Sequence, residues 1–244
     1  MRQLGKLLVV SLMAAVAAAA VVAGSAPAGA HDPAARRPTT TSFGATTRPG
    51  AWVADHHGGT ISKIDPRTNT VVASVPVGLT GSSGPQGIAA GLGSVWVDVP
   101  NSGTVVRVDP ATDTVQATIK VPVEMQPCGG IAVGQTVVWV TSCLEQRLVA
   151  RIDPAANKVA SILDVGGKVV QPAADGDSVW FVAGGDPDLA PTTASLLELG
   201  ADDSVKARYA LQKGFISGGA AVAFGSVWIS DWLKPLVLRI PDGG

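Results

Sequence analysis

The chain of 244 residues is poor in the side chains that carry most enzyme chemistry. It contains two cysteines, three histidines and one tyrosine, and 15% of its residues are charged. It lacks a serine nucleophile elbow, a phosphate-binding P-loop and a dinucleotide-binding fingerprint. The formal net charge is −1 and the Lys and Arg residues are scattered, which argues against nucleic-acid binding and against electrostatic anchoring to a membrane.

Long apolar runs are also absent after the first residues, so no later segment reaches the length of a membrane span. At the start, Arg2 and Lys6 precede an apolar run over 7–24 and the small-residue stretch "SAPAGA". This order predicts a cleaved secretory signal over 1–30, and hence a secreted, periplasmic or cell-surface protein. No cysteine lies near the cleavage site to carry a lipid anchor. Residues 31–47, rich in Pro, Thr and Ala, are expected to form a flexible linker before one domain over 48–244.

Within that domain, a short sequence motif that contains a tryptophan recurs five times. The tryptophans are spaced by 44, 43, 41 and 48 residues and stand in "AWVAD", "VWVDV", "VWVTS", "VWFVA" and "VWISD". Alternating apolar segments separated by Gly, Pro, Asp and Asn turns surround each tryptophan, so each repeat holds four short strands. A period of roughly 40 to 50 residues with four strands per repeat predicts an all-β fold, a β-propeller of about five four-stranded blades.

The recurring residues have structural explanations. A tryptophan on the second strand gives each blade a large apolar plate for its neighbour, so we expect all five to be largely buried between blades. They are Trp52, Trp96, Trp139, Trp180 and Trp228. Asp65-Pro66, Asp109-Pro110 and Asp153-Pro154 are expected to start the turns between the third and fourth strands. Three identical aspartates at blade edges do not form one catalytic site, which favours the structural role.

The pattern "GIA.G..SVWV......G.V.RIDP.T..V.A.I.VG" resembles the exported propellers with YVTN-type repeats. Their relatives include the streptogramin (virginiamycin B) lyases and the quinoprotein amine dehydrogenase β-chain-like superfamily. The resemblance covers residues 50–244 and implies the propeller fold. Blade four replaces the Asp-Pro turn with "LLELGADDSV", and blade five ends before its outer strand. Two readings of the missing strand stay open: residues 39–43 supply it beside residues 236–240, or the propeller is shortened or open and pairs its edge with another subunit.

Candidate binding residues lie in loops expected at one end of the strands, around the mouth of the central channel. We call these the mouth loops; they join the second strand to the third and each blade to the next. Their candidates are His56, His57, Asp98, Asn101, Glu145, Gln146, Arg147, Asp231 and Trp232. Further polar and charged residues of the same loops are Gln86, Gln126, Gln171, Asp186, Asp188 and Lys234.

Neither histidines nor carboxylates in these loops form a metal motif. The adjacent His56 and His57 point to opposite sides of an extended segment and would rarely share one metal. Asp186 and Asp188 are two residues apart, but the rest of a calcium loop is missing. We therefore expect no metal and no cofactor.

Two functions follow. The favoured one is an exported, non-catalytic propeller that binds a small molecule, a glycan or a protein through its mouth loops. The alternative is an enzyme of the streptogramin-lyase type, which opens a macrolactone by metal-assisted elimination. The lyases' repeats continue their tryptophan strand with an aromatic and an acidic residue, whereas this chain has "WVDV", "WVTS", "WFVA" and "WISD". This difference, and the lack of a cluster of catalytic groups, favour the binding function.

We predict a disulfide between Cys128 and Cys143; the alternative is that the two are free, buried thiols that act as small hydrophobic residues. Export removes the reducing pool of the cytosol, and two cysteines have one possible intramolecular pairing. Counting outward from a Gln135-Thr136 hairpin turn places the two residues opposite each other, with Gly129-Gly130 bending to relieve strain. The bond should stabilise the fold by about 3 kcal/mol. Intact mass of the exported protein without reductant tests this: we expect a mass without two thiol hydrogens, and two free thiols would contradict it.

Overall fold

The computed structural model describes residues 20–21, 50–78, 80, 84–142, 147–169, 171–184 and 194–241. These residues form antiparallel strands and two short 3-10 helices, η1 (Pro100–Ser102) and η2 (Val123–Met125). In this part of the chain, no helix has the length and apolar character to cross a membrane.

Five sheets follow one another along the chain, and within each sheet every strand pairs with the next. The first sheet contains β1 (Ala20–Val21), β2 (Ala51–Asp55), β3 (Thr60–Asp65) and β4 (Thr70–Pro76). The second contains β5 (Ile88–Gly91), β6 (Ser94–Val99), β7 (Thr104–Asp109) and β8 (Thr114–Lys120). The third contains β9 (Pro127–Val133), β10 (Val138–Ser142), β11 (Leu148–Asp153) and β12 (Lys158–Asp164). The fourth contains β13 (Ala173–Asp175), β14 (Ser178–Ala183), β15 (Ser195–Gly200) and β16 (Val205–Ala210). The last contains β17 (Ser217–Ala223), β18 (Ser226–Asp231) and β19 (Val237–Pro241).

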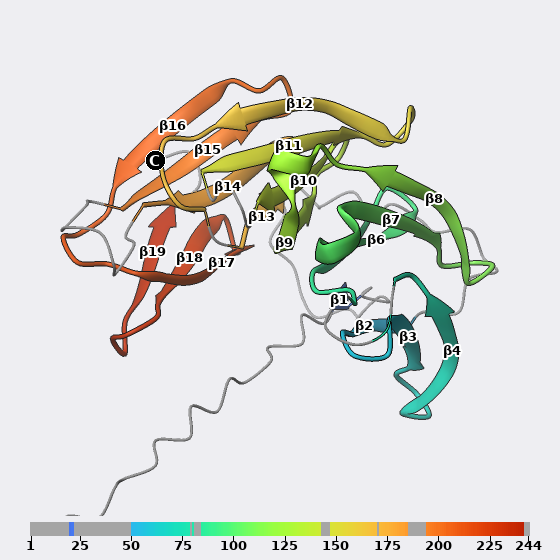
Figure 1. The fold of residues 1–244 in the computed structure, drawn as a ribbon. Helices are drawn as coiled ribbons and strands as arrows, with labels where there is room; N and C mark the ends of the chain where they lie inside the picture. Colours follow the sequence, from blue (N-terminus) through green and yellow to red (C-terminus); the bar gives the residue numbers. More distant parts are fainter. Residues whose placement is uncertain are drawn as a thin grey trace, which may run out of the picture.

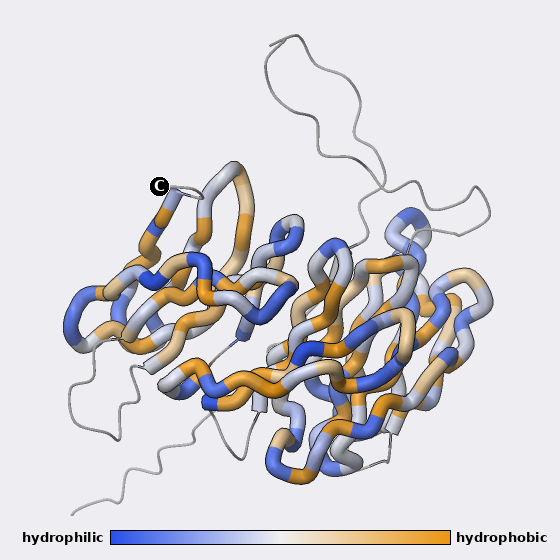
Figure 2. The backbone as a smooth tube through the Cα atoms, turned by 90° about the horizontal axis from the view of Figure 1, so that it is seen from above, coloured by the Kyte–Doolittle hydropathy of each residue, from blue (hydrophilic) through white to orange (hydrophobic). Residues whose placement is uncertain are grey.

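The sheets are arranged around an arc as the blades of a β-propeller (Figure 1). The first strands of successive sheets contact one another, and the first and last sheets stand at the two ends of the arc. The fold predicted from the repeats is confirmed, including a last blade with three strands among the described residues. In Figure 2 the hydrophobic residues lie along the strands and hydrophilic residues mark many of the turns.

The hydrophobic core lies between neighbouring sheets. Because side chains alternate along a strand, each sheet presents two faces. We call the face that carries the repeat tryptophan the forward face, because it packs against the next sheet in the chain, and the opposite face the backward face. Trp96 and Val105 on the forward face of the second sheet pack against Val140 and Ile152 on the backward face of the third.

Burial of the tryptophans follows this stacking. Trp52, Trp96, Trp139 and Trp180 are at most 1% exposed, as expected. Trp228 is only partly buried, because it lies on the forward face of the last sheet and no described sheet follows it.

A basic side chain opposite the tryptophan connects each of the first three sheets to the next. Lys63 pairs across the strands with Trp52 and lies 5.4 Å from its ring centroid. Its Nζ donates to the carbonyl of Pro110 at 2.7 Å and to Asp113 Oδ1 at 2.8 Å, both in the β7–β8 turn of the second sheet. The ammonium group is thus shared between a ring on its own sheet and a turn on the next one. We call this arrangement the clasp.

The same contact recurs along the arc. Arg107 Nη1 donates to the carbonyl of Pro154 at 2.7 Å and to Asn157 Oδ1 at 3.1 Å. Arg151 binds Asp203 through two hydrogen bonds of 2.6 and 3.1 Å, which raise the pKa of the arginine above its ordinary value. The fourth sheet departs from the pattern: Glu198 is opposite Trp180 and accepts a hydrogen bond from Ser178 Oγ at 2.6 Å.

The Asp-Pro turns have the structural role expected of them. Oδ1 of Asp65, Asp109 and Asp153 accepts the backbone N–H two residues ahead, each at 2.8 Å. The hydrogen bonds from Arg67 lower the pKa of Asp65, and those from Ala156 and Ala155 lower the pKa of Asp153. These carboxylates hold the turns that receive the clasps, rather than one shared site.

The first strand of the first sheet has an origin that the repeats do not indicate. β1 comes from Ala20 and Val21, which lie opposite Trp52 and Ala51 and fall within the predicted signal. Residues 39–43, one proposed source of the missing outer strand, are outside the described residues.

The hairpin that bears the cysteines departs from the expected register. Gly134 N donates to the Val137 carbonyl at 2.9 Å, and the strands pair as counted as far as Ile131 opposite Val140. Pro127 then lies opposite Ser142, because β9 takes four residues where β10 takes two. Counting outward from the turn therefore fails between Ile131 and Pro127, in the stretch that contains the two glycines expected to bend. The Cys128 side chain and all of Cys143 lie outside the described residues, so the disulfide stays a prediction.

Candidate functional site

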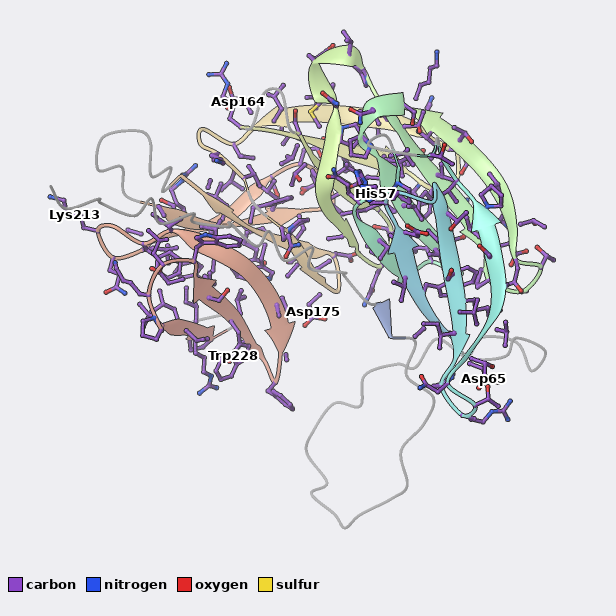
Figure 3. The ribbon with its side chains drawn as sticks, turned by 60° about the horizontal axis from the view of Figure 1, so that its bottom comes forward. His57, Asp65, Asp164, Asp175, Lys213 and Trp228 are labelled. Carbon is purple, nitrogen blue, oxygen red and sulfur yellow. The ribbon has the colours of Figure 1, made fainter. Side chains whose placement is uncertain are left out.

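The mouth loops lie at the end of the sheets opposite the Asp-Pro turns. Figure 3 shows this for the first sheet, where His57 and Asp65 are at opposite ends of the strands. The chain topology places the corresponding loops of the other sheets at the end marked by His57.

The two histidines are held separately in the first mouth loop. His56 is half-buried and its Nδ1 is 3.2 Å from the carbonyl oxygen of Pro85, whereas His57 is exposed. Their rings meet edge to face with centroids 5.4 Å apart. Over the described ranges, no three side chains of the His, Cys, Asp and Glu types come together to hold a metal ion.

Asn101 lines a hollow of about 510 Å³ in the mouth loops of the second sheet. Gln126 Nε2 donates to Asn101 Oδ1 at 3.2 Å, which connects the loop after β6 to the loop before β9. The rim includes Val123, which is 85% exposed. Two residues chosen from the sequence are thus brought together here, although nothing in the sequence indicated the hollow itself.

Asp98 is fully buried. Its Oδ1 accepts the backbone N–H of Gly87 at 2.8 Å, and its backbone exchanges hydrogen bonds with Gln86 and Gly87. The geometry places Asp98 beneath the loop between the first and second sheets, where it fixes the backbone rather than facing solvent.

The third and fourth sheets add little to the described site. Glu145, Gln146, Asp186 and Asp188 lie outside the described residues. Arg147 Nε is 3.1 Å from Asp164 Oδ2, and both side chains are largely exposed. An exposed pair of this kind contributes little to stability because water screens it.

A buried carboxylate organises the mouth loop of the last sheet. Asp231 Oδ1 accepts the backbone N–H groups of Leu233 at 2.9 Å and Lys234 at 3.0 Å, and Oδ2 accepts that of Ile216 at 3.5 Å. Burial raises the pKa of Asp231, but these backbone N–H groups together lower it by more, so that the pKa lies below its ordinary value. The carboxylate is therefore charged at neutral pH and fixes the course of the loop.

That loop presents two large apolar side chains to solvent. Trp232 is 70% exposed and Leu233 is 67% exposed. Trp232 N donates to the Ile216 carbonyl at 2.7 Å, and Lys234 Nζ donates to the Gly214 carbonyl at 2.7 Å, so the backbone on both sides is anchored. Sequence reasoning selected Asp231 and Trp232 but missed Leu233. The feature that could have indicated Leu233 is that it directly follows a tryptophan that does not belong to the repeats.

Comparison with known proteins supports the fold alone. No family model matches the chain, and no curated protein matches it by sequence. Among solved structures, it is similar to a streptogramin B lyase (18% identity, TM-score 0.61, covering 75% of this chain and 59% of that one). It is also similar to the hydrazine synthase of Kuenenia stuttgartiensis (14%, 0.61, 85% and 70%) and to BamB of Moraxella catarrhalis (12%, 0.55, 75% and 51%). The chain thus spans little more than half the length of the lyase.

We predict that Asp231 makes stability depend on acid pH. Because its folded pKa lies below the unfolded value of about 3.9, its contribution is complete above that value and is lost as the pH falls through the folded pKa. Asp231→Asn should lower the free energy of unfolding by about 1–2 kcal/mol at neutral pH, and by progressively less below about pH 4.

Denaturant unfolding across this pH range measures the difference. Glu124→Gln, which removes an exposed carboxylate of η2, is the matched control and should leave stability unchanged. A difference between wild type and Asp231→Asn that stayed constant with pH would contradict the role given to the charged carboxylate.

Proposed function

We propose that this chain is an extracytoplasmic, non-catalytic binding protein that holds an apolar segment of a protein partner against the mouth loop of its last sheet. The observation that carries the proposal is the exposure of Trp232 and Leu233 side by side on a loop fixed by a buried carboxylate. The signal predicted over 1–30 supports the location.

The fixed loop favours binding for an energetic reason. Association has to offset the ordering of side chains and loops at an interface. Here the backbone of the loop is already held by Asp231 and by the hydrogen bond from Trp232 N to Ile216. Much of the ordering cost is therefore met in the free protein, and the indole ring adds large contact area with few rotatable bonds.

The chemistry of the loop favours a protein segment over the other ligands expected. A small molecule is normally enclosed by a concave site, whereas Trp232 and Leu233 project from the surface. An indole ring alone would suit the face of a sugar, but the adjacent leucine extends the apolar area, which suits apolar side chains.

The alternative is an enzyme related to the streptogramin lyases. It is supported by the similarity to the streptogramin B lyase structure and to a catalytically inactive virginiamycin B lyase of Staphylococcus aureus with quinupristin (15% identity, TM-score 0.62). Against it, His56 is hydrogen-bonded to a backbone carbonyl, and Asp98 and Asp231 are committed to backbone N–H groups. The exposed His57 is the remaining candidate for a general base, and the double histidine replacement described below tests it.

We predict that removing the exposed pair abolishes binding without affecting the fold. Peptides selected from a displayed random library should be rich in apolar residues and should bind the combined Trp232→Ala and Leu233→Ala variant at least about tenfold more weakly. Val205→Ser removes an apolar side chain with 56% exposure on β16, away from the mouth loops, and should leave affinity unchanged. Fluorescence or calorimetric titration measures both.

Three outcomes would contradict the proposal. One is that selected peptides bind the double variant as well as the wild type. Another is that a glycan array, but no peptide, gives binding that depends on Trp232. The third is turnover of quinupristin that is lost when His56 and His57 are both replaced by alanine, which would establish the enzyme instead.

A further inference from the structure

The forward face of the last sheet carries the same residues as the forward faces that are buried elsewhere. In the second sheet, Trp96 and Val105 are fully buried against the third sheet. At the matching positions of the last sheet, Trp228 is only partly buried and Val237 is 60% exposed. The last sheet therefore has an interface surface that no described sheet covers.

The hairpin turns at the edge of these faces match as well. Leu92 and Phe224 occupy the same turn position, with φ values of 53° and 54°, which large apolar residues rarely adopt. Leu92 packs against the core between the second and third sheets, whereas Phe224 is 92% exposed. A bulky side chain held in an unfavourable backbone conformation and left in water indicates a contact that the described residues do not complete.

Arg239 indicates what kind of surface the last sheet would contact. Its Nε donates to Ser226 Oγ at 2.9 Å and its Cζ lies 5.7 Å from the Trp228 ring centroid. The Arg107 side chain is placed in the same way: its Nε donates to Ser94 Oγ at 2.8 Å, and its Cζ lies 5.0 Å from the Trp96 ring centroid. Arg107 then forms a clasp to the next sheet, but the terminal Nη atoms of Arg239 donate to no acceptor among the described residues. The last sheet therefore has the basic side chain of a clasp, but no described turn accepts its hydrogen bonds.

A turn that could accept these hydrogen bonds lies on the first sheet. The turn after Asp65 contains Pro66 and Asn69, which match Pro154 and Asn157 of the third sheet. Asn69 has the left-handed φ of 55° that Asn157 also has, at 49°. Pro66 and Asn69 are both exposed, and in the described chain no basic side chain reaches them.

The backward face of the first sheet completes the match. Val53 and Ile64 occupy the positions of Val140 and Ile152, which are fully buried by the second sheet. Val53 and Ile64 are only partly buried. Figures 1 and 3 show that the first and last sheets lie at separate ends of the arc, so the two surfaces do not meet within one copy.

We infer that the forward face of β17–β19 binds the backward face of the first sheet of a second copy of this chain. In the contact, Arg239 donates to the Pro66 carbonyl and the Asn69 side chain of the neighbouring copy, and Trp228, Val237 and Phe224 become buried. The two surfaces differ, so the contact is head to tail. Such contacts extend into a filament, or form a ring where the rotation between copies closes.

Sedimentation over a wide concentration range tests this with the purified protein. The wild type should self-associate. Arg239→Glu and Asn69→Gly should each weaken association at least about tenfold, the first by removing the donor and the second by removing the acceptor at a turn position that glycine tolerates. Arg208→Glu, an exposed arginine on β16 of the fourth sheet, is the matched control and should associate as the wild type does.

Mixing the two variants separates a head-to-tail contact from other modes. Arg239→Glu leaves the first sheet intact, and Asn69→Gly leaves the last sheet intact, so the mixture should form one-to-one dimers and nothing larger. A wild type that stays monomeric at all concentrations, association that neither variant weakens, or a mixture that forms larger assemblies would each overturn the inference. Peptide binding through Trp232 and Leu233 is measured separately, so loss of one result leaves the other standing.

Discussion

Stacking of one sheet on the next through a tryptophan and a basic side chain is the interaction on which this structure depends. A single small sheet cannot cover its own two faces, so its apolar side chains are buried only when a neighbour covers them. Trp52, Trp96, Trp139 and Trp180 supply the buried area, and the clasps from Lys63, Arg107 and Arg151 fix the turn of the following sheet relative to that area. The basic side chains remain hydrogen-bonded while their aliphatic portions lie over the core.

Because each sheet depends on its neighbours, residues that hold the sheets together can be distinguished from residues that are available to bind a partner. The strands and the Asp-Pro turns carry contacts between sheets, and some mouth loops do as well, as in the hydrogen bond from Gln126 to Asn101. The mouth loop of the last sheet instead presents Trp232 and Leu233 to solvent. The buried Asp231 carboxylate accepts the backbone N–H groups of their loop and so holds these two exposed side chains in place. At the ends of the arc the same stacking has no described partner, which leaves Trp228, Arg239 and Phe224 uncovered.

The repeats allowed the fold to be predicted in detail, because each tryptophan, glycine turn and Asp-Pro pair carries a local physical requirement. The clasps were not predicted, since the lysine or arginine and its acceptors are 47 to 52 residues apart and belong to different repeats. The register near Cys128 was missed because two adjacent glycines permit an irregularity that counting cannot detect. Site residues were chosen by loop position alone, which selected the exposed Trp232 but did not show that Asp98 is buried or that Arg147 pairs with Asp164. Burial and pairing depend on neighbouring sheets rather than on local sequence.

The clasp between Arg151 and Asp203 provides the most direct test of the central claim. The two side chains are 22% and 24% exposed and are joined by two hydrogen bonds across the boundary between the third and fourth sheets. A double-mutant cycle with Arg151→Ala and Asp203→Ala measures their coupling in the free energy of unfolding. The stacking account predicts a coupling of about 1 kcal/mol or more, above the range of about 0.2–1 kcal/mol that is typical of exposed pairs. A coupling near zero would contradict the claim that these clasps hold successive sheets together.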